Sequence, residues 1–134
     1  MRTSWRRFAF LAMAMATVAA CGSDKSTGPG DTVSLAGQYT LTSFKEGNND
    51  LSQATSGTLA LTATNYTVNI TFQGDAAPPI ADQGTYTATS NGSFSQTSSS
   101  SGAQSTGTYT LVNGLLTLNV TEQGMAISQT WQKQ

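Results

Sequence analysis

Histidine is absent from this sequence, and cysteine occurs only once, at Cys21. Histidine is the commonest general base in enzymes and a usual ligand of zinc, copper and haem iron. Without it, neither a Ser-His-Asp nor a Cys-His arrangement can be built. The sequence therefore predicts a protein that is not an enzyme and that uses no cofactor.

Charge is also scarce, because only 10% of the residues are charged. All three arginines, Arg2, Arg6 and Arg7, lie at the N-terminus, and beyond them three lysines stand against seven acidic residues, a formal charge of −4. No basic patch remains there, so we expect no nucleic-acid partner. Disordered chains usually combine high net charge with few aromatic residues. Here the abundant Thr, Ser, Gln and Gly favour ordered strands with hydroxyl-rich outer faces instead.

Two pairs of acidic residues were candidates for chemistry. Glu46 and Asp50 fall in one predicted loop, and Asp75 and Asp82 flank another. Paired carboxylates can hydrolyse glycosides or bind hard cations. Neither pair has the spacing of a ligand set, and loop acids are commonly solvated. We therefore expect no catalytic site and no metal site at either pair.

The N-terminus has the three zones of a secretory signal peptide. The three arginines form a basic region, residues 8–18 are apolar, and Ala19 and Ala20 are small. A helix over residues 8–20 would be roughly 20 Å long, at about 1.5 Å per residue. This is short of the roughly 30 Å hydrocarbon core of a bilayer. Residues 1–20 therefore predict a cleaved signal peptide in preference to a transmembrane helix.

The stretch Val18-Ala19-Ala20-Cys21-Gly22-Ser23 resembles the lipobox of bacterial lipoproteins. The resemblance implies cleavage before Cys21, a diacylglycerol on its sulfur and a further acyl chain, such as palmitate, on its new amino group. Several acyl chains hold a protein on a membrane essentially permanently, whereas one chain binds marginally. Gly22, in a position where Asp commonly signals retention at the inner membrane, favours the outer membrane of the cell envelope if the cell has two membranes.

Residues 21–34 are polar and lack periodicity, which predicts a flexible linker between the lipidated cysteine and a domain over residues 35–134. In that domain, short runs alternate apolar and polar residues, as half-buried strands do. The clearest is 66–72, where Tyr66, Val68, Ile70 and Phe72 share one face. The predicted strands are 38–45, 58–63, 66–72, 83–89, 93–97, 106–112, 115–121 and 125–131.

The connections between these strands are short or turn-like. Asn91-Gly92 and Asn113-Gly114 predict tight type I′ hairpins, Pro78-Pro79 predicts a longer loop, and residues 98–105 predict a flexible Ser/Gly connection. Short connections favour antiparallel neighbours, and closure removes the two free edges of a meander. The sequence therefore predicts an all-β fold, a single eight-stranded antiparallel up-and-down barrel.

This domain resembles the small lipocalin-like domains of bacterial lipoproteins. The resemblance is carried by Leu35-Ala36-Gly37-Gln38-Tyr39-Thr40-Leu41 on the first strand, Gly107-Thr108-Tyr109-Thr110 on a later strand, and Trp131-Gln132-Lys133 on the last. In lipocalins, a Gly-x-Trp on the first strand packs beneath a basic residue of the last strand. Here Tyr39 takes the place of the Trp, and Lys133 is the candidate cation.

An eight-stranded barrel is just wide enough to be filled by side chains or to hold one small ligand. The first alternative predicts a non-catalytic structural or interaction protein of the cell envelope with a solid barrel. The second predicts an envelope lipoprotein that binds a small hydrophobic ligand. The sequence makes no prediction of the oligomeric state. The candidate cavity residues are Tyr39, Leu41, Tyr66, Val68, Tyr86, Tyr109, Leu118, Ile127 and Trp131.

Overall fold

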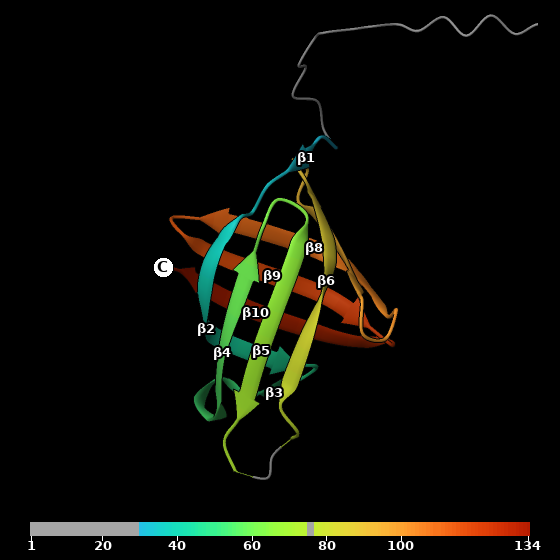
Figure 1. Ribbon diagram of the computed structural model, residues 1–134. Coiled ribbons are helices and arrows are strands. Elements are labelled where there is room, and N and C mark those ends of the chain that lie inside the picture. Colours follow the sequence, from blue (N-terminus) through green and yellow to red (C-terminus); the bar gives the residue numbers. More distant parts are fainter. Residues whose placement is uncertain (1–29, 75–76) are drawn as a thin grey trace, which may run out of the picture.

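Eight strands of the computed structural model close into one antiparallel barrel (Figure 1). The structure describes residues 30–74 and 77–134. Each strand pairs with the next along the chain, and β2 pairs with β10 to close the cylinder. The predicted all-β, up-and-down barrel is confirmed. The barrel strands are β2 (Gly37–Glu46), β4 (Thr55–Leu61), β5 (Asn65–Phe72), β6 (Ile80–Thr89), β7 (Ser93–Ser98), β8 (Gln104–Val112), β9 (Leu115–Glu122) and β10 (Met125–Lys133).

One end of the barrel is plugged by its own core. Trp131, Tyr39 and Leu116 are at most 1% exposed, and Leu35 lies across this end at 4% exposed. The Tyr39 hydroxyl donates a hydrogen bond of 2.7 Å to the carbonyl oxygen of Leu35, and the Leu35 N–H donates to the Tyr86 hydroxyl at 3.0 Å. Burial of these large side chains supplies most of the apolar stabilisation at this end.

Ordered structure begins earlier than the sequence predicts. β1 (Thr32–Val33) lies inside the expected linker of residues 21–34, yet it pairs with Thr89 and Ala88 of β6. The pairing between β5 and β6 ends at Thr85, but β6 continues to Thr89. β1 pairs with the last residues of β6 and so satisfies backbone groups that β5 does not reach. The predicted signal peptide and Cys21 lie outside the described residues.

A β-bulge in β2 changes which of its residues face the interior. Leu41 pairs with Trp131 but Ser43 pairs with Thr130, so Thr42 is an extra residue on β2. Simple alternation from Tyr39 and Leu41 would place Ser43 inward. Instead Phe44 is buried, at 3% exposed.

Two connections differ from their predictions. Asn113-Gly114 has positive φ at both residues (51° and 77°), as a type I′ turn requires, whereas at Asn91-Gly92 only Gly92 does. The β6–β7 hairpin therefore has a three-residue loop instead of the predicted tight turn. The predicted flexible connection 98–105 is shortened to residues 99–103 because the Ser98 hydroxyl accepts hydrogen bonds from the N–H groups of Ser100 and Ser101, both at 3.2 Å.

The remaining elements are a two-residue strand, β3 (Asn49–Asp50), and a 3₁₀ helix, η1 (Ser52–Ala54). Both lie beside β2 at the end of the barrel opposite β1 (Figure 1). In residues 30–74 and 77–134, no helix is long and apolar enough to cross a membrane.

Candidate ligand-binding pocket

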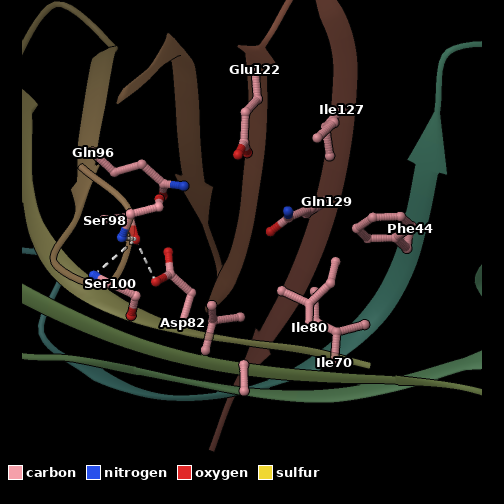
Figure 2. A pocket seen from close by; sticks show the side chains of 13 residues that line it. Phe44, Ile70, Ile80, Asp82, Gln96, Ser98, Ser100, Glu122, Ile127 and Gln129 are labelled. Atoms are coloured by element: carbon pink, nitrogen blue, oxygen red, sulfur yellow. Dashed lines mark hydrogen bonds between the residues drawn. The ribbon is translucent and has the colours of Figure 1, made fainter. Parts of the chain in front are cut away.

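The end of the barrel opposite β1 is hollow. A pocket of about 360 Å³ lies between the first residues of β6, the β7–β8 loop and the last residue of β9 (Figure 2). This volume falls in the range of about 300–1,000 Å³ that is usual for small-molecule sites. Its lining residues are Phe44, Val68, Ile70, Ile80, Ala81, Asp82, Gln96, Ser98, Ser100, Ser101, Glu122, Ile127 and Gln129.

One wall of the pocket is apolar. Ile70 and Ile80, on β5 and β6, face Phe44 and Ile127 on β2 and β10 (Figure 2). Ile70 is buried at 1% exposed, whereas Ile80 is 39% exposed at the mouth. An apolar molecule that enters here would remove these side chains from water, which is favourable in proportion to the area covered.

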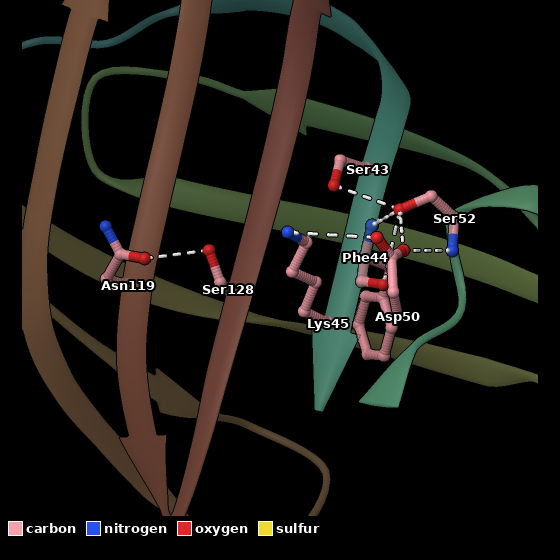
Figure 3. Close-up of polar contacts among 7 residues, drawn as sticks. All are labelled: Ser43, Phe44, Lys45, Asp50, Ser52, Asn119 and Ser128. Carbon is pink, nitrogen blue, oxygen red and sulfur yellow. Dashed lines mark hydrogen bonds and ion pairs between the residues drawn. The ribbon is translucent and has the colours of Figure 1, made fainter. Parts of the chain in front are cut away.

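Phe44 is held in this wall from both sides. Its ring packs edge-on against Phe72, with the ring centroids 5.6 Å apart. Its N–H donates to the Ser52 hydroxyl at 3.1 Å (Figure 3). Its carbonyl oxygen accepts from the Leu51 N–H at 2.9 Å. The segment β3–η1 therefore fixes the backbone of β2 just after the bulge, and with it the direction of Phe44.

The opposite wall is polar and centres on Asp82. The Tyr66 hydroxyl donates to one carboxylate oxygen of Asp82 at 2.6 Å, and the Ser98 hydroxyl donates to the other at 2.7 Å. Gln96, Glu122 and Gln129 project into the same space (Figure 2). Two hydroxyl donors thus orient the Asp82 carboxylate while the rest of the wall stays polar.

Hydrogen bonding keeps Asp82 ionised. Burial alone would raise the pKa of Asp82, but the hydrogen bonds from Tyr66 and Ser98 outweigh it and lower that pKa below its usual value. Burial, and then the bond to Asp82, raise the pKa of Tyr66, so Tyr66 stays a neutral donor. At neutral pH the polar wall therefore carries a fixed negative charge.

A second carboxylate, Glu122, lines the pocket nearer its mouth. The Ser105 hydroxyl, on a residue only 2% exposed, donates to a carboxylate oxygen of Glu122 at 3.3 Å. Glu122 also lines a shallower hollow of about 290 Å³ that includes Glu46, Ile80 and Met125. The mouth of the barrel therefore combines acidic and apolar side chains.

Neither lysine of the described chain lines the pocket. The Lys45 ammonium lies 3.7 Å from an Asp50 carboxylate oxygen on the outer face of β2 (Figure 3). Asp50 also accepts hydrogen bonds from the N–H and hydroxyl of Ser52, at 3.0 and 2.6 Å. Lys133 lies at the plugged end, where it pairs through its backbone with Tyr39. The negative charge of the pocket is thus not compensated by a nearby cation from these residues.

The structure describes three of the four acidic residues that form the two pairs in the sequence. Asp50 is exposed and pairs with Lys45, whereas Glu46 lies at the mouth. Asp82 lines the pocket, and Asp75 lies outside the described residues. Within the part of the chain that the structure describes, no group of three or more acidic or cysteine side chains could hold a metal ion.

The structure divides the candidate cavity residues between pocket and core. Val68 and Ile127 line the pocket. Tyr109 is half-buried against the core, and its hydroxyl donates to the carbonyl oxygen of Thr89 at 2.9 Å. The others, which are buried in the core, are Tyr39, Leu41, Tyr66, Tyr86, Leu118 and Trp131.

Two of these core residues still reach the pocket through hydrogen bonds. Tyr66 does so through Asp82, and the Trp131 indole N–H donates to the Gln129 side-chain oxygen at 3.1 Å. The sequence analysis placed Asp82 beside a loop and expected no site there, and it did not name Glu122 or Gln129 as site residues. Each lies an even number of residues from a buried residue of the same strand. Because side chains alternate between the two faces of a strand, extending the apolar pattern along each strand predicts that these polar residues also face the interior.

Comparison with known families agrees with this architecture. The model of a family described as a lipocalin-like domain matches residues 35–132. The matched segment contains nearly the whole barrel, from two residues before β2 to one residue before the end of β10. Comparison with curated proteins finds no match. Because the family model covers well over half of the sequence, the chain belongs to the lipocalin-like domain family.

Proposed function

We propose that this protein is a non-catalytic binding protein that holds a small, mainly apolar ligand in the open end of its barrel. The observation that carries the proposal is the pocket of about 360 Å³, which is lined in part by the apolar side chains of Phe44, Ile70 and Ile127. Members of the family are typically binding proteins, which agrees with the proposal. The alternative of a solid barrel is less well supported, because a pocket of this volume lies at the end of the barrel opposite β1.

We also propose that Cys21 carries lipid and holds the barrel at the cell envelope, on the outer membrane where there are two. The described chain begins at Gly30, and β1 lies at the plugged end of the barrel (Figure 1). The pocket mouth is at the other end. A lipid attached through the N-terminal segment would therefore leave the mouth facing away from the membrane surface to which the protein is anchored.

A ligand panel tests the binding proposal. The full chain, held in a bulky sterol-based detergent too large for the pocket, is titrated with alkyl alcohols, alkylamines and fatty acids, and binding is counted by native mass spectrometry. We expect saturable binding of one molecule to at least one class. Saturable binding to none of these ligands would contradict the proposal.

A pair of variants on β5 shows whether the bound molecule is in the pocket. Val68→Trp fills the pocket from its wall, whereas Thr67→Trp places the same bulk on the exposed outer face. We expect Val68→Trp to abolish binding and Thr67→Trp to leave it intact, with both variants checked for folding by circular dichroism. Equal binding by the two variants would place the ligand elsewhere.

A further inference from the structure

We propose that the ligand is a small cationic amphiphile, in which a protonated amine lies against Asp82 and Glu122 and an apolar body covers the wall formed by Phe44, Ile70 and Ile127. This inference rests on the proposed binding function and specifies the chemical class of the ligand. A neutral apolar molecule would leave the polar wall without a partner.

The first support is uncompensated charge inside a cleft. Asp82 and Glu122 both line the pocket, and neither described lysine does. Charges of one sign in a cleft with low-dielectric walls concentrate the opposite charge there. A fatty acid would bring a third carboxylate into the same space and would be repelled. Charge therefore favours an amine over the carboxylate ligands that an apolar pocket would otherwise accept.

The second support is the hydrogen-bonding capacity of Asp82. A carboxylate offers about four lone-pair sites. Tyr66 and Ser98 donate to different oxygens of Asp82, and the backbone of Gln83 and the side chain of Ser100 add weaker hydrogen bonds. A charged donor forms a stronger hydrogen bond to a carboxylate than a neutral one does, so an ammonium group can take the place of the weaker donors. An ammonium group has three N–H donors and no acceptor. The side-chain oxygen of Gln96 lies on the same wall and is a further acceptor within this pocket.

The third support is that the pocket is lined by both acidic and apolar side chains. Asp82 on β6 and Glu122 on β9 are acidic, whereas Phe44, Ile70 and Ile127 are apolar (Figure 2). A molecule with one charged end and one apolar side satisfies both kinds of lining at once. A bare divalent cation would satisfy only the acidic wall, and the described residues offer no third acidic or cysteine ligand to complete its coordination.

The test compares octylamine, octanol and octanoate, which have the same chain length and differ in the charge of one end. Affinities for the full chain in the same sterol-based detergent are measured by calorimetry at neutral pH. The same titrations of the Val68→Trp variant, in which the pocket is filled, measure how much of each probe enters the detergent micelles instead of the protein. We expect octylamine to bind at least about tenfold more tightly than octanol and octanoate to bind more weakly than either, with the amine's advantage shrinking as salt is added.

Variants locate the charge that is responsible. We expect Asp82→Asn and Glu122→Gln each to weaken octylamine binding by about tenfold, the effect of losing one charge-assisted hydrogen bond, with little effect on octanol. Asp31→Asn is the matched control, because it removes an exposed acid beside β1, at the end of the barrel opposite the pocket. If loss of the Asp82 charge disturbs folding, Glu122→Gln still tests the proposal, because the hydrogen bond that Glu122 accepts from Ser105 is long, at 3.3 Å.

The outcomes separate this inference from the proposed function. Equal affinity for octylamine and octanol, or an Asp31→Asn loss as large as that of Asp82→Asn, would overturn the cationic ligand while leaving an apolar binding pocket. No saturable binding of any of the three probes would overturn both.

Discussion

The Lys133 ammonium lies 5.9 Å from the centre of the Tyr39 ring and donates a hydrogen bond of 3.1 Å to the carbonyl oxygen of Ala36. A cation at this distance from an aromatic face is attracted by the ring quadrupole. Gly37 makes the arrangement possible, because a Cβ there would lie 2.7 Å from Cε of Lys133. The basic residue of the last strand thus covers a Gly-x-aromatic of the first, with tyrosine in place of tryptophan.

The contact predicts a measurable coupling between the two strands. We expect Lys133→Met to lower the free energy of unfolding by about 0.5–1 kcal/mol, the usual range for an exposed cation–π pair. Lys45→Met, which removes an exposed ion pair, is the control and should change it by less than about 0.5 kcal/mol. Urea unfolding of Lys133→Met in the wild type and in a Tyr39→Leu background measures the coupling. An equal loss in both backgrounds would show that the two side chains do not interact.

Gly84 predicts a much larger effect on stability. It lies on β6 where the strand approaches β7 so closely that a Cβ would come 1.9 Å from the Thr97 carbonyl oxygen and 3.0 Å from the Tyr66 ring. The first of these atoms is backbone and cannot move aside without breaking strand pairing. We expect Gly84→Ala to cost about 3 kcal/mol or more, the upper end for overpacking. Thr85→Ala, at the next and exposed position, should cost far less; equal losses in urea unfolding would contradict this account.

The barrel was predictable because its determinants are local. The alternation of Tyr66, Val68 and Ile70 and the turn at Asn113-Gly114 are written into consecutive residues, and each short connection leaves an antiparallel neighbour as the simple choice. Closure then follows from the cost of two free edges. The family resemblance of Gly37 and Tyr39 pointed to the same architecture.

The pocket was less predictable because its determinants are not local. The bulge at Thr42 depends on the register between β2 and β10, which neither strand specifies alone, so Phe44 was not recognised as an inward residue. Inward polar residues such as Asp82 look like surface residues when polarity is the guide. Which end of the barrel stays hollow depends on Leu35, which packs into the other end. Leu35 lies outside every predicted strand, so the strand pattern could not reveal this contact.

Acid should destabilise the protein partly through Asp82. Its pKa in the folded state lies below the usual 3.8, so the folded state binds this proton less tightly than the unfolded state. The stabilisation is therefore complete above pH 3.8 and is lost as pH falls through the lower folded value. We expect the melting temperature of the wild type to fall more steeply below that pH than the melting temperature of Asp82→Asn. Parallel falls in both proteins would contradict a lowered pKa.

Tyr66→Phe offers a second check on the same carboxylate. This variant removes the hydroxyl that donates to Asp82 at 2.6 Å while keeping the buried ring. We expect its acid-induced loss of stability to lie between those of the wild type and Asp82→Asn, because Ser98 still donates to the other oxygen.

The proposed lipid anchor predicts a change of cellular fraction. Cys21→Ser removes the only sulfur that could be acylated at a cysteine. We expect the variant to leave the membrane fraction after alkaline washing, and the wild type to remain and to show the mass of an acylated N-terminal cysteine. A Ser23→Ala variant, altered just after the lipobox cysteine, is the matched control and should stay with the membrane. Retention of Cys21→Ser would show that another feature holds the protein there.

Occupation of the pocket should be visible in the fluorescence of Trp131. The indole is fully buried and donates to Gln129, whose side chain lines the pocket. A ligand that displaces the Gln129 side chain removes the hydrogen-bond acceptor of the indole, so the emission should shift to shorter wavelength as octylamine binds. Trp5 lies in the predicted signal peptide, and Trp5→Phe makes Trp131 the sole tryptophan wherever residues 1–20 are retained. In this protein Gln129→Leu should show the shifted emission without ligand and no further change on binding. Unchanged emission at saturation, with binding established by native mass spectrometry, would place the ligand away from Gln129.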